Sequence, residues 1–162
     1  MKAQKNVLSI LVNNKLDVLA RIAGTFSGRN VNIESISANT TMDPERTRIV
    51  ITAMGDNATM EKIVKQVAKL VDIIEARNLT DLSSVRREMI LVRLDWSHGN
   101  NRREIEALAQ TKGWKILNAD ERRCIMEITG ENGLLMEEIT GLRRFGLEDF
   151  TRTGVAAIEQ GL

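Results

Sequence analysis

The apolar positions in the first part of the chain follow two different periods. Residues 7–12 form a short run of mostly branched apolar side chains, which is typical of a buried strand. Helical spacing then sets in with five apolar residues: Val18, Leu19, Ile22, Ala23 and Phe26. The polar residues 13–17 therefore form the turn between a strand and a helix, where free backbone N–H groups suit a small carboxylate.

A second helix is predicted after the start signal Asp56-Asn57, from apolar residues at i, i+3, i+4 and i+7. Those residues are Met60, Ile63, Val64, Val67, Leu70 and Val71. Three strands surround this helix in the sequence, at residues 31–39, 47–54 and 72–78, with a turn at Asp43-Pro44. The chain to about residue 80 therefore has the order strand, helix, strand, strand, helix, strand.

The same order begins again after the polar break at residues 81–84. The pattern predicts a strand at 90–96, a helix ended by Gly113, a hairpin of strands 114–119 and 122–129, a helix ended by Gly146, and a last strand at 150–158. We therefore predict an α+β fold of two βαββαβ units, each a ferredoxin-like sandwich with its helices on one face of the sheet. The predicted domains are residues 1–80 and 81–162.

The predicted topology places one strand of the first unit in an exposed position. In a spatial order of 4-1-3-2 the second strand lies at the edge of the sheet, and residues 32–39 contain no Pro or Lys that would prevent edge pairing. Two copies of the chain could align these edges around a two-fold axis. We therefore expect a homodimer that forms through the first units.

Charge and hydropathy exclude several classes of partner. The chain has 23 basic and 22 acidic residues, so it lacks the basic face that phosphate backbones require. Few aromatic residues are available to stack on RNA bases, since there are three Phe, two Trp and no Tyr. No stretch approaches the ~20 apolar residues of a membrane span, and the first residues lack a signal-peptide pattern. We expect a cytoplasmic protein that binds neither nucleic acid nor membranes.

The inventory of reactive side chains is poor. His98 is the one histidine and lies on a polar stretch, where an exposed loop residue is favoured over a general base. Cys124 is the one cysteine and alternates with Met126 and Ile128, so core packing is favoured over a reactive thiol. No zinc set or phosphate-binding loop occurs. We therefore expect no catalytic residue and no metal site in this chain.

Two motifs resemble those of a known family. Asn14, Val18, Leu19, Arg21 and Ile22, followed by Asn32-Ile33-Glu34-Ser35, resemble an ACT domain, and more closely the regulatory (small) subunit of acetolactate synthase. Further segments are similar to that family and extend the resemblance over nearly the whole chain: Asp43-Pro44, Thr47-Arg48, Lys69-Leu70-Val71-Asp72, Arg87-Glu88 and Arg152-Thr153-Gly154.

The resemblance implies a function and a set of partners. It implies a non-catalytic, allosteric subunit in branched-chain amino-acid (valine, leucine, isoleucine) biosynthesis that forms ACT-domain dimers and activates the catalytic (large) subunit. Valine would be the feedback effector. No cofactor would bind this chain, because thiamine diphosphate, Mg and FAD would belong to the catalytic partner. The alternative function is a stand-alone ACT-type amino-acid-binding regulator of another enzyme or of transcription.

The same resemblance implies an effector site for valine, formed by Asn14, Leu16, Asp17, Val18, Leu19, Asn32 and Ile33. The amides of Asn14 and Asn32 match both ends of an amino acid, although both residues could instead be turn asparagines that bond their own backbone. Asn30, after the first helix, is predicted to adopt the left-handed conformation. Trp96 and Trp114 are either core residues or anchors on a partner surface.

Leu16 and Asp17 depart from the family, which usually has Pro and Gly at these positions. Three interpretations of Asp17 remain open: it caps the helix, it abolishes effector binding, or it turns toward the ammonium group of the ligand. A Cβ atom at this position would be unfavourable if φ is positive. The sequence therefore suggests weak or absent valine inhibition, with activation of the partner intact.

Overall fold

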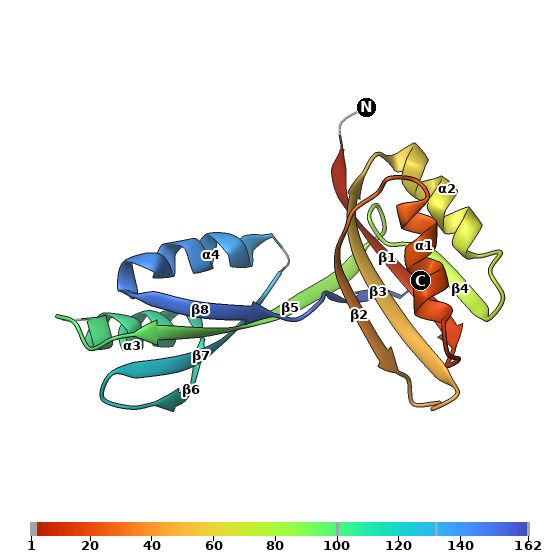
Figure 1. The fold of residues 1–162 in the computed structure, drawn as a ribbon. Helices are drawn as coiled ribbons and strands as arrows, with labels where there is room; N and C mark the ends of the chain where they lie inside the picture. The colour runs from red at the N-terminus through yellow and green to blue at the C-terminus, as the bar shows by residue number, and fades with distance from the viewer. Residues whose placement is uncertain (1–2, 100, 132, 162) are drawn as a thin grey trace. The chain divides into compact units, whose positions relative to one another are not determined.

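The computed structural model describes residues 3–99, 101–131 and 133–161, and the chain divides into two compact units (Figure 1). The first unit consists of Met1–Arg86 together with Gly154–Leu162, and the second consists of Arg87–Thr153. The boundary between the units thus follows Arg86, later than the predicted position after residue 80. The second unit is inserted into the first, because the chain returns to the first unit at Gly154.

The first unit has the predicted order of elements. These are β1 (Gln4–Asn13), α1 (Val18–Ser27), β2 (Ile33–Thr40), β3 (Arg46–Gly55), α2 (Asn57–Val67) and β4 (Ile73–Asn78). Its sheet has the order β2-β3-β1-β4, and every pairing is antiparallel. The predicted position of β2 at the sheet edge is therefore confirmed. Helices α1 and α2 lie side by side and pack on one face of this sheet (Figure 1).

The packing of the first unit follows from strand alternation in β1. Alternate residues of β1 point to the helices, where they are buried together with side chains of α1 and α2; these include Leu8, Ile10, Val12, Ile22, Phe26, Met60 and Ile63. Asp56 caps α2 because its carboxylate accepts a hydrogen bond from the Thr59 N–H at 3.1 Å. The helix ends at Val67, so its predicted extension to Val71 is wrong. Val71 is 73% exposed and precedes Asp72, whose φ is 73°.

The other face of the first sheet is covered by the C-terminal segment of the chain. Val155 is buried there with Val7, Val50 and Leu79. The prediction of one last strand at residues 150–158 is wrong, because two separate strands are present. Strand β8 (Leu147–Arg152) belongs to the second unit, and β9 (Ala156–Glu159) pairs with β5 (Ser84–Asp95). Residues 153–155 leave the strand pattern so that Val155 can reach the first sheet.

The second unit repeats the ferredoxin-like order. Strand β5 is followed by α3 (Asn101–Lys112), β6 (Lys115–Ala119), β7 (Arg123–Gly130), α4 (Leu134–Leu142), a short 3-10 helix η1 (Arg143–Phe145) and β8. The sheet order β6-β7-β5-β8 matches the predicted one. Gly113 and Gly146 have φ values of 70° and 76° and follow α3 and η1, as expected for glycines that end helices. The α+β prediction of two such units is confirmed.

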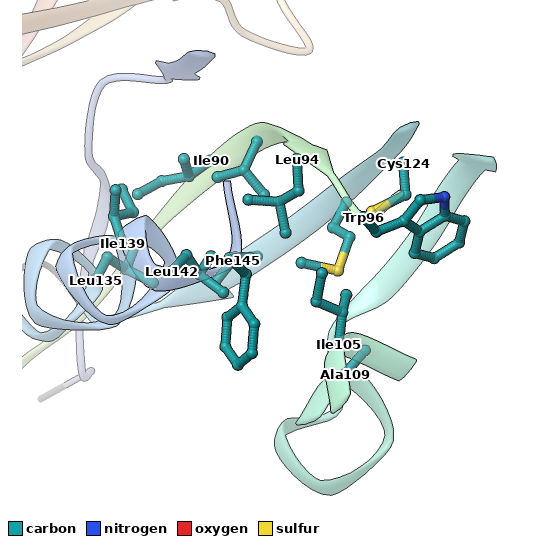
Figure 2. Close-up of a cluster of buried hydrophobic side chains, with 13 residues drawn as sticks. Ile90, Leu94, Trp96, Ile105, Ala109, Cys124, Leu135, Ile139, Leu142 and Phe145 are labelled. Carbon is teal, nitrogen blue, oxygen red and sulfur yellow. The ribbon is translucent and has the colours of Figure 1, made fainter. Parts of the chain in front are cut away.

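The core of the second unit lies between its sheet and both of its helices. Figure 2 shows Leu135, Ile139 and Leu142 of α4 beside residues of β5, with Ile105 of α3 in the same buried cluster. Trp96 and Cys124 are buried members of this cluster, and Trp114 packs against it. The core interpretation of these residues is therefore confirmed.

His98 has a side chain that is 82% exposed, as predicted for a loop residue. Its Nε2 lies 3.9 Å from the Asp95 carboxylate, and Asp95 also contacts Ser97 and Arg122. The pKa of Asp95 is lowered to about 2, mainly because Ser97 donates hydrogen bonds to it through its hydroxyl and its N–H.

Within the described ranges, no helix is long and apolar enough to span a bilayer.

The environment of Cys124 generates a prediction about its reactivity. Burial, together with the smaller effects of the Asp120 and Glu106 carboxylates, raises the pKa of this thiol to about 11. The fraction of reactive thiolate is therefore about a hundredfold smaller than for an exposed thiol. We expect slow alkylation by iodoacetamide in the folded chain at mildly alkaline pH and rapid alkylation in concentrated guanidinium. Equal rates in both conditions would contradict the buried position.

Candidate functional site

The turn between β1 and α1 is held by backbone contacts with two other turns. Asn13 N–H donates to the Asp72 carbonyl at 2.8 Å, and Asn14 N–H donates to the Glu45 carbonyl at 2.7 Å. The side-chain Nδ2 of Asn14 donates to the Pro44 carbonyl at 3.1 Å. Asn14 therefore does not bond its own backbone, as the simple turn interpretation would require. Its amide joins the β1–α1 turn to the β2–β3 turn and positions both.

Helix α1 begins without a side-chain cap. Asp17 occupies the N-cap position with φ 65° and ψ −10°, a left-handed conformation, and its carboxylate makes no capping hydrogen bond. The interpretation of Asp17 as an ordinary side-chain cap is therefore wrong. The first turn of α1 contains no acidic residue, so its N–H groups retain the positive end of the helix dipole. Such a helix start is suited to an anionic group.

The carboxylate of Asp17 is directed to an arginine one turn along the helix. Arg21 Nε lies 3.3 Å from Asp17 Oδ2, and Arg21 Nη2 lies 3.0 Å from Asp72 Oδ2. Arg21 Nη1 also donates to the Val71 carbonyl at 3.1 Å. Two carboxylates thus share one guanidinium, which leaves one net negative charge beside the start of α1. The Asp17 side chain nevertheless stays 68% exposed, so its contact with a ligand ammonium group remains a prediction.

A hollow of about 290 Å³ lies beside this turn, and its walls come from β1, α1, β2 and β3. Three of the predicted site residues line it, namely Asn14, Val18 and Leu19. Seven lining residues were missed by the sequence analysis: Val12, Asn13, Lys15, Ala38, Thr40, Thr47 and Ile49. The lining combines apolar residues with asparagine, threonine and lysine. This mixture suits a small molecule with an aliphatic part and a charged end.

Some of the missed residues carried a usable signal. Ala38 and Thr40 are two positions apart on β2, and Thr47 and Ile49 are two positions apart on β3, so each pair points to one face of the sheet. Because α1 covers that face, residues opposite its first turn had to lie near the predicted site. Lys15 had no such signal except its position inside the turn.

The predicted residues Asn32 and Ile33 lie in a different place. They line a second hollow of about 380 Å³, near the C-terminal end of α1, together with residues that include Phe26 and Asn30. Within one chain, the structure therefore does not bring Asn32 and Asn14 together. Asn30 has φ 55°, which confirms its predicted left-handed conformation. Leu16 is 92% exposed. Neither Leu16 nor Asp17 lines either hollow.

Two family models and several named relatives match this chain. Residues 8–75 match the model of the AHAS small subunit-like ACT domain, and residues 87–161 match that of the small subunit of acetolactate synthase. The acetolactate synthase small subunit of Mycobacterium bovis is 30% identical, over 99% of this chain and 95% of that protein. A protein of Archaeoglobus fulgidus with the name "Probable acetolactate synthase small subunit" is 34% identical over 97% and 98% of the two chains.

The chain belongs to the acetolactate synthase small-subunit family. A solved structure agrees, since the crystal structure of the small subunit from Thermotoga maritima superposes with a TM-score of 0.87 at 31% identity. That match covers 98% of this chain and 99% of the other. The named relatives are small subunits, which accords with a non-catalytic role. In the second unit, Arg152 donates two hydrogen bonds to the Glu88 carboxylate, at 2.6 and 2.9 Å.

The left-handed conformation of Asp17 generates a stability prediction. Asp17→Gly relieves the contact of Cβ with the backbone, whereas Asp17→Ala keeps Cβ and loses the polar side chain. We expect Asp17→Ala to unfold with a free energy about 1 kcal/mol lower than Asp17→Gly. Urea titration followed by far-UV circular dichroism measures the difference, because both tryptophans lie in the second unit and fluorescence would not report on α1.

Ala20 provides the matched control for this pair of variants. It is exposed inside α1, where Gly should be less stable than Ala by about 1 kcal/mol. The preference between Gly and Ala should therefore have opposite signs at positions 17 and 20. Equal signs at the two positions would contradict the left-handed conformation of Asp17.

Proposed function

We propose that this chain is a regulatory subunit that activates the thiamine-diphosphate-dependent catalytic subunit of acetolactate synthase, and that its first unit carries a valine site weakened by Asp17. The observation that carries the effector part is the hollow beside the uncapped start of α1. The proposal of a catalytic partner rests on membership of the small-subunit family.

The lining of the hollow supports a small aliphatic amino acid as the ligand. In the proposed complex, the carboxylate of valine accepts hydrogen bonds from the free N–H groups at the start of α1. Lys15 adds a positive charge at the same wall. Val18, Leu19 and Ile49 supply the apolar surface for the isopropyl group. Leu19 is 42% exposed, so part of this surface is open before a ligand or a partner covers it.

Asp17 weakens this proposed interaction in two ways. Its Cβ occupies a position where the family has Gly, and its carboxylate contributes to the net negative charge that remains after pairing with Arg21 and Asp72. Two like charges about 4 Å apart cost between about 1 kcal/mol in water and about 4 kcal/mol near a protein surface. Arg21 reduces this cost without removing it. We therefore propose weak or absent valine inhibition, with activation of the catalytic partner intact.

A homodimer completes the proposed site. The edge position of β2 allows two copies to pair their first sheets around a two-fold axis. Asn14 and Asn32 lie in separate hollows at different ends of α1. Pairing of the β2 edges would bring Asn14 of one protomer near Asn32 of the other. A valine bound there would change how the first units of the two protomers are arranged. The catalytic subunit would respond by a change in the populations of its conformational states.

The proposal predicts how two substitutions at position 17 alter binding. Titration calorimetry with valine should show weak or no binding to the parent chain. Asp17→Gly should bind at least about tenfold more tightly, because it removes both Cβ and charge. Asp17→Asn removes the charge alone, so its affinity separates the electrostatic cause from the steric one. Asp81→Asn, an exposed position of the first unit, is the matched control and should leave affinity unchanged.

An activity measurement tests the other half of the proposal. The parent chain and Asp17→Gly should both raise the activity of the purified catalytic subunit, and valine should inhibit more strongly with Asp17→Gly. Tight valine binding by the parent chain would contradict the role given to Asp17. Failure of the chain to co-purify with a large thiamine-dependent chain, and to activate it, would favour a stand-alone regulator.

A further inference from the structure

The face of the first sheet that α1 and α2 do not cover is occupied by the chain's own C-terminal residues 154–160, which we name the C-terminal clasp. Val155 is 1% exposed and packs against Val7 of β1, Val50 of β3 and Leu79. Because side chains alternate along a strand, Val7 and Val50 point away from the helices, where a sheet without the clasp would expose them.

Polar contacts hold the far end of the C-terminal clasp. Glu159 Oε2 accepts a hydrogen bond from Arg77 Nη1 of β4 at 2.6 Å. Gln160 N–H donates to the Ser83 carbonyl at 2.9 Å. The segment is therefore attached to the first unit by an apolar anchor at Val155 and by an ion pair and a hydrogen bond beyond it.

The near end of the C-terminal clasp lies directly against the edge strand β2. A Cβ atom on Gly154 would be 2.9 Å from Ser37 Cβ and 3.0 Å from the Ser37 backbone nitrogen. Such distances leave no room for a side chain, so glycine is required here by the close approach of two backbones. Gly154 thus supports β2 from behind, on the face opposite α1.

The other face of β2 forms part of the candidate effector hollow. Ala38 and Thr40 line that hollow, and Ser37 precedes Ala38 on the opposite face. As an edge strand, β2 has only β3 as a partner within its sheet. We propose that Gly154 and Val155 are positioning residues for effector binding, because the C-terminal clasp holds β2 in the place that the hollow requires. This inference rests on the proposed binding of valine in that hollow.

The chain immediately before the C-terminal clasp is fixed inside the second unit. Thr153 N–H donates to the Met89 carbonyl at 3.0 Å, and Met89 N–H donates to Thr153 Oγ1 at 3.0 Å. Arg152 forms the bidentate pair with the buried carboxylate of Glu88. Gly154, which contacts β2, is therefore joined by one peptide bond to Thr153, which is held in the second unit. A displacement of β2 would be transmitted to Thr153 through this bond. The second unit is therefore linked covalently to the C-terminal clasp, which in turn contacts the strand that lines the candidate hollow.

Full-length variants test the role of the C-terminal clasp. Val155→Ala removes most of the buried side chain, and Gly154→Ala introduces Cβ where Ser37 lies. Ile158→Ala is the matched control, since Ile158 lies in β9 but is 70% exposed. Hydrogen exchange, measured by mass spectrometry on peptides that cover residues 33–40, reports on β2 independently of any ligand. We expect exchange in β2 to become at least about fivefold faster in Val155→Ala and Gly154→Ala and to stay unchanged in Ile158→Ala.

Valine affinity is measured for the same substitutions in the Asp17→Gly chain, where the parent affinity is expected to be measurable. Val155→Ala and Gly154→Ala should weaken valine binding at least about fivefold, with Ile158→Ala unchanged. Unchanged exchange in β2 for both clasp variants would overturn the inference, as would faster exchange with undiminished affinity. Absence of valine binding to Asp17→Gly itself, with faster exchange in β2, would overturn the proposed function and leave the support of β2 by the C-terminal clasp established.

Discussion

Burial of β1 on both faces is the constraint on which the first unit depends. One face of β1 packs against α1 and α2, and the other packs against the C-terminal clasp. A ferredoxin-like sheet can leave its second face in water, but the apolar residues Val7 and Val50 require a cover here. The first unit therefore remains incomplete until residues from the far end of the chain are added.

The electrostatics of the effector region follow from one arginine. Arg21 lies between Asp17 and Asp72, so it holds the start of α1 against the turn before β4 and lessens the repulsion between the two carboxylates. With Gly in place of Asp17, the same arginine would face one carboxylate, and the helix start would carry no net negative charge. The identity of one turn residue thus decides whether the charged side chains beside the start of α1 carry a net negative charge or none, where a ligand carboxylate would bind.

Local patterns predicted most of the fold, whereas contacts between distant segments were not predictable. The apolar run at residues 7–12 and the helical spacing in α2 predicted the element order, and the turn chemistry of Asn30 predicted its backbone conformation. The C-terminal clasp was missed because residues 150–158 continue a strand pattern, and nothing local shows that Val155 packs on another sheet. The side-chain direction of Asp17 was missed because it depends on φ and on Arg21, although the i,i+4 spacing of the two residues was a usable signal.

Insertion of the second unit into the first sets an order for folding during synthesis. The ribosome makes β1 to β4 early, but Val155 leaves the ribosome only after β5 to β8 have been made. Val7 and Val50 consequently stay uncovered while the whole second unit is translated. The nascent chain thus carries an apolar sheet face that closes only when the inserted unit is complete, so synthesis of the second unit is a condition for covering the second face of the first sheet.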